Sequence, residues 1–403
     1  MTGVDSVKWK LVIASNILDI RDGTHDSPKY HSEGVPLVTS KNLKGGDIDF
    51  SSCNFISEQD HKKISKHSKV DAGDILYAMI GTIGNPVLVG AYDFDFSIKN
   101  VALFKQADNS KICSKFLLHF LQTDIVKWQF KKKTRGGTQK FVSLKNIRNL
   151  QIPLPPLAEQ QRIAEILDKA DALREQRKQS IALLDKLLQS VFLDMFGDPV
   201  TNPMGWEVAK LDTQVITNPK LDKTKLSNNL NKITSFVPMS SVSDIQQCVT
   251  EYEMKPLKEV IKGFTTFEKS DIILAKITPC FENKKLAFLS NMPTPIGFGS
   301  TEFHVFRVTN KEIIKPIFLK YILKQDYFFK VGKFKMRGAV GQRRVPIDFF
   351  KNFSLILPPL EIQNQFAHIV EKIEAQKALQ QAQLKQLDNL FGCLQQKAFS
   401  GEL

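Results

Sequence analysis

One sequence pattern occurs twice in the chain, and the second copy lies about 200 residues after the first. Leu154-Pro155-Pro156-Leu157 opens a long amphipathic segment, and Leu357-Pro358-Pro359-Leu360 opens another. Tandem prolines hold the backbone extended and do not fit inside a helix, so each motif forms a stiff connection before a helix. Because solenoids and propellers repeat every ~20–50 residues, this much longer period indicates a duplicated two-part unit.

Both proline motifs lead into stripes of apolar residues at coiled-coil spacing. Across 163–195 and 366–394, apolar side chains recur three or four residues apart, as a coiled-coil seam requires. A helix with one apolar stripe is unstable in water unless the stripe is covered. We therefore expect the two helices to pair antiparallel with one domain at each tip; the alternative is that each helix packs on its own domain. Pairing also brings together the polar midpoints of the seams, around 174–180 and 376–383, which disfavours shifted registers.

The rest of the sequence predicts two mixed domains. In the first copy, β-prone runs at 34–39, 74–80 and 100–104 are bounded by Gly, Asn and Asp, and a helix is expected over 115–128. The landmarks that match between the copies are Trp9 with Trp206, 74–78 with 271–275, and 116–121 with 317–323.

The predicted fold class is therefore α+β. Two mixed α/β domains are joined by two long helices that form an antiparallel coiled coil, and the chain has a pseudo-two-fold repeat. In residue numbers, the first domain covers 1–152, the first helix 153–199, the second domain 200–356 and the second helix 357–403.

The composition favours an anionic partner. The chain carries 56 Lys and Arg against 42 Asp and Glu, a net charge of +14, so nucleic acid is the first candidate and an anionic membrane surface the second. No apolar run reaches the roughly 18 residues of a membrane span, and residues 1–10 lack the apolar centre of a signal peptide. We expect a cytoplasmic protein with no membrane partner. The scattered cysteines, and Cys53, His61 and His67 in particular, match no zinc spacing, so we expect reduced thiols and no metal.

Each copy contains a basic, aromatic segment that ends in a glycine turn, at 127–140 and 328–344. Cations neutralise phosphates, Gln and Arg have the donors and acceptors to read adenine and guanine, and glycine lets the backbone approach a duplex closely. A charge run alone is usually a solvated face, but the same order of cation, glycine, glutamine and cation in both copies favours nucleic acid. The candidate residues are Lys131, Lys132, Lys133, Arg135, Gln139 and Lys140 in the first copy, and Lys333, Lys335, Arg337, Gln342, Arg343 and Arg344 in the second.

Motifs for catalysis are missing from the sequence. An amino-methyltransferase needs an Asn/Asp-Pro-Pro-aromatic loop, but both Pro-Pro pairs are Leu-Pro-Pro-Leu connections. Gly81-Thr82-Ile83-Gly84 lacks the third glycine and the following helix of a cofactor loop, and no Gly-Lys-Ser/Thr phosphate loop occurs. We expect a chain that is not an enzyme. The alternatives are a stand-alone sequence-specific DNA-binding regulator, a nuclease or methyltransferase fragment, and a coiled-coil scaffold without nucleic acid.

Taken in order, the motifs resemble the specificity (S) subunits of Type I restriction–modification systems over essentially the whole chain. They are Asp22-Gly23-Thr24-His25, Gly73-Asp74-Ile75-Leu76, Gly81-Thr82-Ile83-Gly84, Gly137-Thr138-Gln139-Lys140, Leu154-Pro155-Pro156-Leu157-Ala158-Glu159-Gln160, Phe196-Gly197-Asp198-Pro199, Thr278-Pro279-Cys280-Phe281-Glu282-Asn283 and Gly299-Ser300-Thr301-Glu302-Phe303-His304. In one respect the sequence departs from the pattern, because Lys284-Lys285 follows Asn283 where a glycine and a lysine are more usual.

The resemblance implies that the two domains are target-recognition domains, each of which reads half of a split site in double-stranded DNA. A helix of about 40 residues would hold them about 60 Å apart, at ~1.5 Å per residue. It further implies two modification subunits, which methylate adenine with S-adenosylmethionine, and restriction subunits that translocate DNA with ATP and Mg²⁺. This chain would bind none of these cofactors itself. The resemblance adds Thr24, His25, Lys284 and Lys285 to the candidate DNA contacts.

Overall fold

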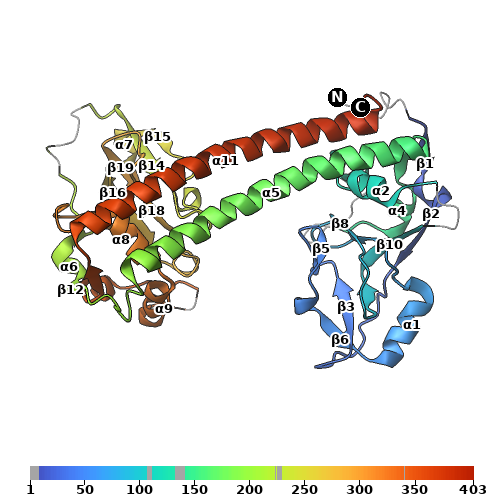
Figure 1. Ribbon diagram of the computed structural model, residues 1–403, viewed down its shortest axis with the longest axis horizontal. Helices are drawn as coiled ribbons and strands as arrows, with labels where there is room; N and C mark the ends of the chain where they lie inside the picture. Colours follow the sequence, from blue (N-terminus) through green and yellow to red (C-terminus); the bar gives the residue numbers. More distant parts are fainter. Residues whose placement is uncertain (1–8, 107–110, 132–140, 223, 225–228, 340) are drawn as a thin grey trace. The chain divides into compact units, whose positions relative to one another are not determined.

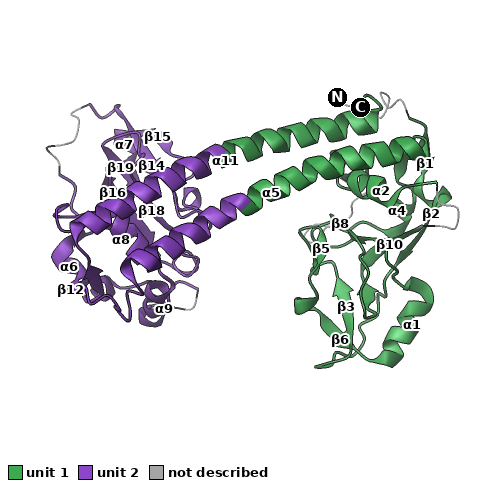
Figure 2. Cartoon of the chain, viewed as in Figure 1, with its two compact units in different colours: residues 1–179, 380–403 green, residues 180–379 purple. Residues whose placement is uncertain are grey.

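The chain folds into two compact units (Figures 1 and 2). Unit 1 contains residues 1–179 and 380–403, and unit 2 contains residues 180–379. Each unit therefore combines one globular domain with one half of each long helix. The computed structural model describes residues 9–106, 111–131, 141–222, 224, 229–339 and 341–403.

Unit 1 is a mixed domain of short strands and helices. Its strands are β1 Leu11–Ile13, β2 Leu18–Asp22, β3 Val35–Thr39, β4 Leu43–Lys44, β5 Asp47–Ile48, β6 Asn54–Ile56, β7 Ile75–Ala78, β8 Gly84–Leu88, β9 Ser97–Lys99, β10 Val101–Gln106 and β11 Gln151–Pro153. Its helices are η2 Ala14–Asn16, η3 Phe50–Ser52, α1 Glu58–Ser68, α2 Ser114–Leu121, α3 Asp124–Lys131, α4 Leu144–Arg148 and the first half of α5 Leu157–Phe196.

Unit 2 contains the corresponding elements of the second copy. Its strands are β12 Glu207–Lys210, β13 Val215–Thr217, β14 Ile233–Val237, β15 Glu253–Pro256, β16 Thr265–Glu268, β17 Ile272–Ala275, β18 Leu286–Phe288, β19 Ile296–Gly299, β20 Phe303–Val308 and β21 Ser354–Leu357. Its helices are α6 Leu211–Gln214, η5 Met239–Ser241, α7 Leu257–Val260, α8 Pro316–Leu323, α9 Asp326–Lys335, α10 Ile347–Lys351 and the first half of α11 Leu360–Ser400.

The sheets of the two units share one topology. The order β2-β10-β7-β8 in unit 1 corresponds to β13-β20-β17-β18 in unit 2, and the ribbon β1-β11 corresponds to β12-β21. A second sheet contains a parallel pair in each unit, β3 with β9 and β14 with β19. Unit 2 adds β16 to that sheet. The predicted α+β class and the duplication are therefore confirmed.

The long helices supply part of each unit's hydrophobic core. In unit 1, Phe399 near the end of α11 packs against Phe116 and Phe120 of α2, with ring centroids 5.2 and 5.3 Å apart. In unit 2, Phe196 at the end of α5 packs against Phe318 of α8 at 4.8 Å. All these rings are fully buried, and buried aromatic pairs of this geometry stabilise a core beyond the area they remove from water.

A buried glutamine fixes the start of each long helix. Gln160 donates through Nε2 to the carbonyls of Lys111 and Pro155, both at 2.9 Å, and accepts at Oε1 from the Cys113 N–H at 2.8 Å. The same three bonds recur at Gln363, which donates through Nε2 to Ile313 O at 2.9 Å and Pro358 O at 2.8 Å and accepts at Oε1 from the Lys315 N–H at 2.9 Å. Because a primary amide satisfies two carbonyls and one N–H at once, each glutamine ties the proline connection to the neighbouring loop.

Within each unit, one ion pair joins the two long helices. In unit 1, Arg174 of α5 contacts Asp388 of α11 at 2.7 Å. In unit 2 the roles are exchanged, and Lys377 of α11 contacts Asp185 of α5 at 2.6 Å. Arg162 of α5 also donates to the carbonyl of Leu403 at 2.8 Å, so low numbers on α5 meet high numbers on α11. The helices are antiparallel, as predicted.

The helix expected over 115–128 is divided into two. Helix α2 ends at Leu121, and α3 begins at Asp124. The Thr123 hydroxyl donates to the carbonyl of Phe120 at 2.7 Å, which competes with the backbone N–H that would continue the helix. Sequence periodicity continues through the break because both helices bury their apolar faces in the same core.

The two ion pairs between the long helices allow a matched test. Because the Lys377 side chain is only 6% exposed, Lys377→Met and Asp185→Asn should show a coupling of about 1–3 kcal/mol in the free energy of unfolding of unit 2. The more exposed Arg174 and Asp388 should show less than about 1 kcal/mol. Chemical denaturation of each single and double variant measures both; additive effects at Lys377 and Asp185 would contradict the pairing.

Candidate nucleic-acid interface

The basic segment of the second copy forms a hairpin. Arg337 and Arg344 pair antiparallel, with N–H to carbonyl distances of 2.9 and 2.8 Å. Gly338 and Gly341 have φ angles of +121° and +79°, which only glycine adopts without strain. The Gln342 N–H donates to the Ala339 carbonyl at 3.0 Å and closes the turn. The glycines predicted to bring the backbone close to a duplex therefore form a tight, exposed turn.

Three contacts anchor this hairpin to the four-stranded sheet. The Thr278 N–H donates to the carbonyl of Arg343 and the Val345 N–H to that of Lys276, each at 2.9 Å. The buried ring of His304 on β20 donates through Nε2 to the Val345 carbonyl at 3.0 Å. The loop is thus attached to a rigid sheet, which restricts the positions its side chains take up.

His304 is held neutral by its surroundings. Its Nδ1 accepts from the Asn218 side-chain amide at 3.1 Å, so a proton on that nitrogen would face a donor. Burial lowers the pKa of His304 from 6.5 to about 4, because the charged form loses its hydration. The neutral ring donates to one backbone carbonyl and accepts from one amide.

The four candidate side chains of the hairpin have different surroundings. Arg337 and Gln342 are exposed, and Arg343 is half-buried. Arg344 binds both carboxylate oxygens of Glu302, at 2.8–3.2 Å. This bond raises the pKa of Arg344 and lowers the pKa of Glu302. Arg344 therefore fixes the hairpin to the loop before β20, whereas Gln342 and Arg337 face solvent.

The other candidates of unit 2 lie on α9 and on the turn between β17 and β18. Lys333 and Lys335 are exposed on α9. Lys284 has a φ of +58° and its ammonium pairs with Asp326, and the Lys285 ammonium donates to the carbonyl of Met239 at 2.9 Å. The structure thus brings α9 and the hairpin together, while both lysines of the turn have internal partners.

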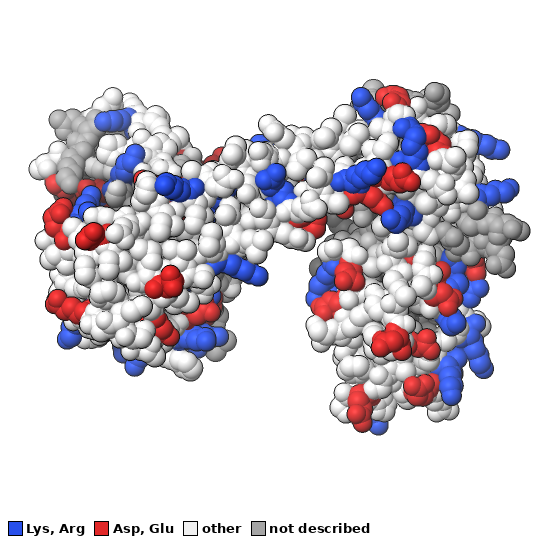
Figure 3. Space-filling view, in the orientation of Figure 1, with Lys and Arg blue, Asp and Glu red and all other residues white. Residues whose placement is uncertain are grey.

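The structure describes only part of the basic segment of unit 1. Lys131 is exposed at the end of α3, whereas Lys132, Lys133, Arg135, Gln139 and Lys140 lie outside the described residues. Figure 3 shows Lys and Arg side chains gathered along the right-hand edge of unit 1 in that view. The predicted roles of these residues stay predictions.

Thr24 and His25 form a compact turn beside β9. A Cβ on Gly23 would lie 2.2 Å from the Ile98 carbonyl oxygen, so only glycine fits there. Both nitrogens of His25 face oxygens, Asn100 Oδ1 and Asp22 Oδ2, each at 2.9 Å. The hydrogen bonds to Asn100 and Asp22 raise the pKa of His25. Its ring thus joins Asp22 and Asn100 within the turn, and the Thr24 hydroxyl accepts from the Asp26 N–H at 3.1 Å.

The sequence-based candidates do not include Phe334. Its side chain is 89% exposed on α9, directly between Lys333 and Lys335. The ring is therefore accessible from solvent between two cations. The available signal was the alternation of Lys and Phe at 333–335, but sequence alone does not distinguish an exposed ring from a buried one.

The described residues form neither a metal cluster nor a membrane-spanning helix. Across 9–106, 111–131, 141–222, 224, 229–339 and 341–403, no group of three or more His, Cys, Asp or Glu side chains is placed to hold a metal ion. Within the same ranges, none of the helices combines the length and apolar character that crossing a membrane requires.

Two units of one topology share a pair of long helices, and unit 2 carries a basic hairpin fixed to its sheet, so the chain is a duplicated protein. The family model described as "Type I restriction modification DNA specificity domain" matches residues 7–183 and again residues 203–389. The chain belongs to this family of DNA specificity domains, and the resemblance noted in the sequence is confirmed.

Curated relatives agree with this family. The Type I restriction enzyme EcoAI specificity subunit of Escherichia coli is 41% identical over 167 residues, which are 41% of this chain and 28% of the relative. The putative type I restriction enzyme MjaX specificity subunit of Methanocaldococcus jannaschii is 25% identical over 391 residues, 91% of this chain and 87% of the relative. The match to the first of these thus spans less than a third of that relative's length.

Solved structures share the fold at low sequence identity. A chain from a structure of the type I R-M system, concerned with its assembly and conformational transition, has a TM-score of 0.55 at 16% identity, with 98% of both chains covered. The Type-I restriction-modification system S subunit from M. genitalium has a TM-score of 0.52 at 14% identity and covers 99% of this chain and 98% of its own. These similarities support the fold alone.

The neutral state of His304 makes unit 2 sensitive to acid. An unfolded histidine binds its proton near pH 6.5 and the folded one near 4, so the unfolded state takes up more protons in this window. The free energy of unfolding of unit 2 should fall by up to about 3 kcal/mol as the pH drops from 6.5 to 4. Denaturation at a series of pH values measures this loss.

The matched control is a variant that keeps both hydrogen bonds of His304 but has no titratable ring. Gln in place of His304 retains one donor and one acceptor, so His304→Gln should remove the acid-dependent loss. The raised pKa of His25 in unit 1 supplies stability below pH ~6.5 that is lost as the pH rises through the folded pKa. His25→Gln should therefore lower the free energy of unfolding of unit 1 at acidic pH and have less effect at higher pH. An unchanged acid loss in His304→Gln would contradict the assignment.

Proposed function

We propose that the chain is the DNA specificity subunit of a Type I restriction–modification complex. Each unit reads one half of a bipartite site in double-stranded DNA. The observation that carries this is the match of a DNA specificity family model to both repeats. A chain that meets DNA twice in equivalent ways requires two equivalent reading surfaces, and the duplicated topology supplies them.

The hairpin of unit 2 has the chemistry for sequence readout. Gln342 is exposed at its tip, and a primary amide forms two bonds to an adenine edge in the major groove. Arg343 has the fork that fits guanine. Lys333, Lys335 and Arg337 flank the tip and suit phosphates, whose neutralisation gives affinity that decreases steeply with salt.

Partner subunits supply the chemistry in this proposal. Two modification subunits bind the chain and methylate adenine with S-adenosylmethionine, and restriction subunits use ATP and Mg²⁺ to translocate DNA, in the cytoplasm. The similarity of the chain to restriction-enzyme specificity subunits supports this arrangement. This chain itself positions the partners on DNA and carries out no catalytic step.

Co-expression with the modification subunits and mapping of methylated adenines tests the proposal. The expected result is one site with two specific halves separated by a fixed gap. Gln342→Ala with Arg343→Ala should relax one half only, by about 1–3 kcal/mol for each lost bidentate contact. Lys262→Ala, at an exposed position of unit 2 outside the hairpin, should leave both halves unchanged.

Two outcomes would contradict the proposal. One is tight, specific binding by the purified chain alone without any adenine methylation in the presence of the modification subunits, which identifies a stand-alone regulator. The other is methylation whose sequence preference is the same in the Gln342→Ala, Arg343→Ala variant.

Phe334 provides a separate prediction about affinity. An exposed aromatic ring between two lysines is placed to stack on a base or to wedge between base steps, contacts worth ~1–3 kcal/mol. Phe334→Ala should therefore weaken DNA binding about 5- to 100-fold with an unchanged dependence on salt, because no phosphate contact is lost. Fluorescence anisotropy over a salt series measures both quantities. Ile245→Ala, which removes an 87% exposed apolar side chain elsewhere in unit 2, is the control; equal losses in the two variants would contradict a specific role of Phe334.

A further inference from the structure

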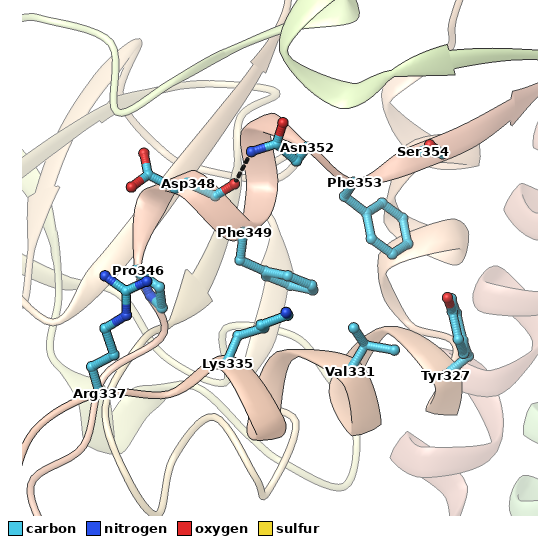
Figure 4. Close-up of a pocket in the computed structure, with 10 residues that line it drawn as sticks. All are labelled: Tyr327, Val331, Lys335, Arg337, Pro346, Asp348, Phe349, Asn352, Phe353 and Ser354. Carbon is cyan, nitrogen blue, oxygen red and sulfur yellow. Dashed lines mark hydrogen bonds between the residues drawn. The ribbon is translucent and has the colours of Figure 1, made fainter.

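Unit 2 contains a cavity of about 420 Å³ between α9, α10 and β21 (Figure 4). Val331 and Tyr327 project into it from α9, and the rings of Phe349 and Phe353 face them. Lys335, Arg337, Asp348, Asn352 and Ser354 complete the lining. The lining therefore combines apolar side chains with charged side chains of both signs.

One wall of the cavity is an open strand edge. In the β12–β21 ribbon, Lys210 lies opposite Ser354, and the next residue pair, Leu211 with Phe353, is joined by an N–H to carbonyl bond of 2.8 Å. Hydrogen-bonded and non-hydrogen-bonded pairs alternate along antiparallel strands, so the N–H and carbonyl of Ser354 point away from β12. Among the described residues, no side chain bonds to either group.

Unit 1 shows what fits such an edge. Its ribbon has the same alternation, because Ala14 bonds to the Leu150 carbonyl at 2.8 Å, and the backbone of Gln151 therefore points outward. The side chain of Gln129 on α3 donates to the Gln151 carbonyl and accepts from the Gln151 N–H, both at 3.0 Å. A primary carboxamide thus closes the edge with a matched pair of hydrogen bonds.

The corresponding residue of unit 2 has no carboxamide. Helices α3 and α9 begin at Asp124 and Asp326, and Gln129 and Val331 are both the sixth residue from that start. Valine has no polar group to bond to the edge at Ser354. Unit 2 therefore combines an unfilled cavity with the donor and acceptor that a carboxamide occupies in unit 1.

We infer that this cavity binds the carboxamide side chain of a glutamine or asparagine from a partner protein. The inference rests on the proposed function, in which the partner is a modification or restriction subunit. A protein side chain is favoured because the backbone of Ser354 offers the same donor and acceptor that a glutamine side chain of the protein itself satisfies at Gln151 in unit 1. The side chain bonds to the backbone of Ser354 and packs its methylene groups on Phe349 and Phe353.

The recognition step is testable without DNA or partner. Propionamide is titrated into the full chain labelled with ¹⁵N at serine, and the Ser354 amide resonance is followed. A saturable shift in the millimolar range is expected, because a ligand of so few atoms binds weakly. Butan-2-one, which has the same shape but no N–H donor, should shift the resonance at least tenfold less.

Two substitutions exchange the residues at the equivalent positions 331 and 129 between the two units. Val331→Gln should fill the cavity from within and abolish the response of Ser354 to propionamide. In unit 1, Gln129→Val should free the edge and make the Gln151 amide, labelled with ¹⁵N-glutamine, respond. No saturable shift at Ser354 in the wild-type chain, or an equal shift with butan-2-one, would overturn the inference while leaving the proposed DNA function untouched.

The Ser354 amide resonance also distinguishes a partner protein from DNA as the occupant of the cavity. Addition of the modification or restriction subunits should shift the Ser354 amide in the wild-type chain, and Val331→Gln should weaken their binding at least tenfold while leaving the recognised DNA halves unchanged. A shift caused by duplex DNA alone, with none caused by the subunits, would assign the cavity to a nucleobase and overturn the choice of a protein partner.

Discussion

The structure depends on the pairing of two long helices whose apolar stripes neither helix can cover alone. Unit 1 is completed by a helix half from a distant part of the sequence, because Phe399 enters its core. In unit 2, which is one continuous stretch, Phe366 of α11 contacts Phe196 of α5 at 5.2 Å. Because the pairing is antiparallel, the ion pair of Arg174 with Asp388 recurs with exchanged roles between Lys377 and Asp185. The duplication is therefore a property of the contacts as well as of the sequence.

Backbone hydrogen bonds fix the position of the hairpin that we propose for DNA recognition. The hairpin of unit 2 is held by backbone bonds to Thr278 and Lys276 and by the ring of His304, so its base is fixed to the sheet before any partner is present. Restricting the loop in advance lowers the entropy lost on binding. The bond of Arg344 to Glu302 holds the hairpin to the loop before β20.

Patterns that reflect burial could be predicted from the sequence, whereas individual partners could not. The apolar runs at 75–78 and 272–275 are the central strands β7 and β17, because their residues are buried on both faces. The break between α2 and α3 was not predicted, since both helices keep the same apolar period. The internal pairing of Lys284 with Asp326, the carbonyl contact of Lys285 and the exposure of Phe334 depend on tertiary position, which charge and aromatic patterns do not encode.

The most direct test removes residues 380–403 and follows hydrogen exchange across the rest of the chain. This segment belongs to unit 1, and it carries Phe391, Ala398 and Phe399 into that core. Amides of β10, α2 and the first half of α5 should lose their protection, while those of β17 and β20 in unit 2 keep theirs. Unchanged protection in unit 1 would show that its domain is complete without the far end of the chain, and would contradict the account.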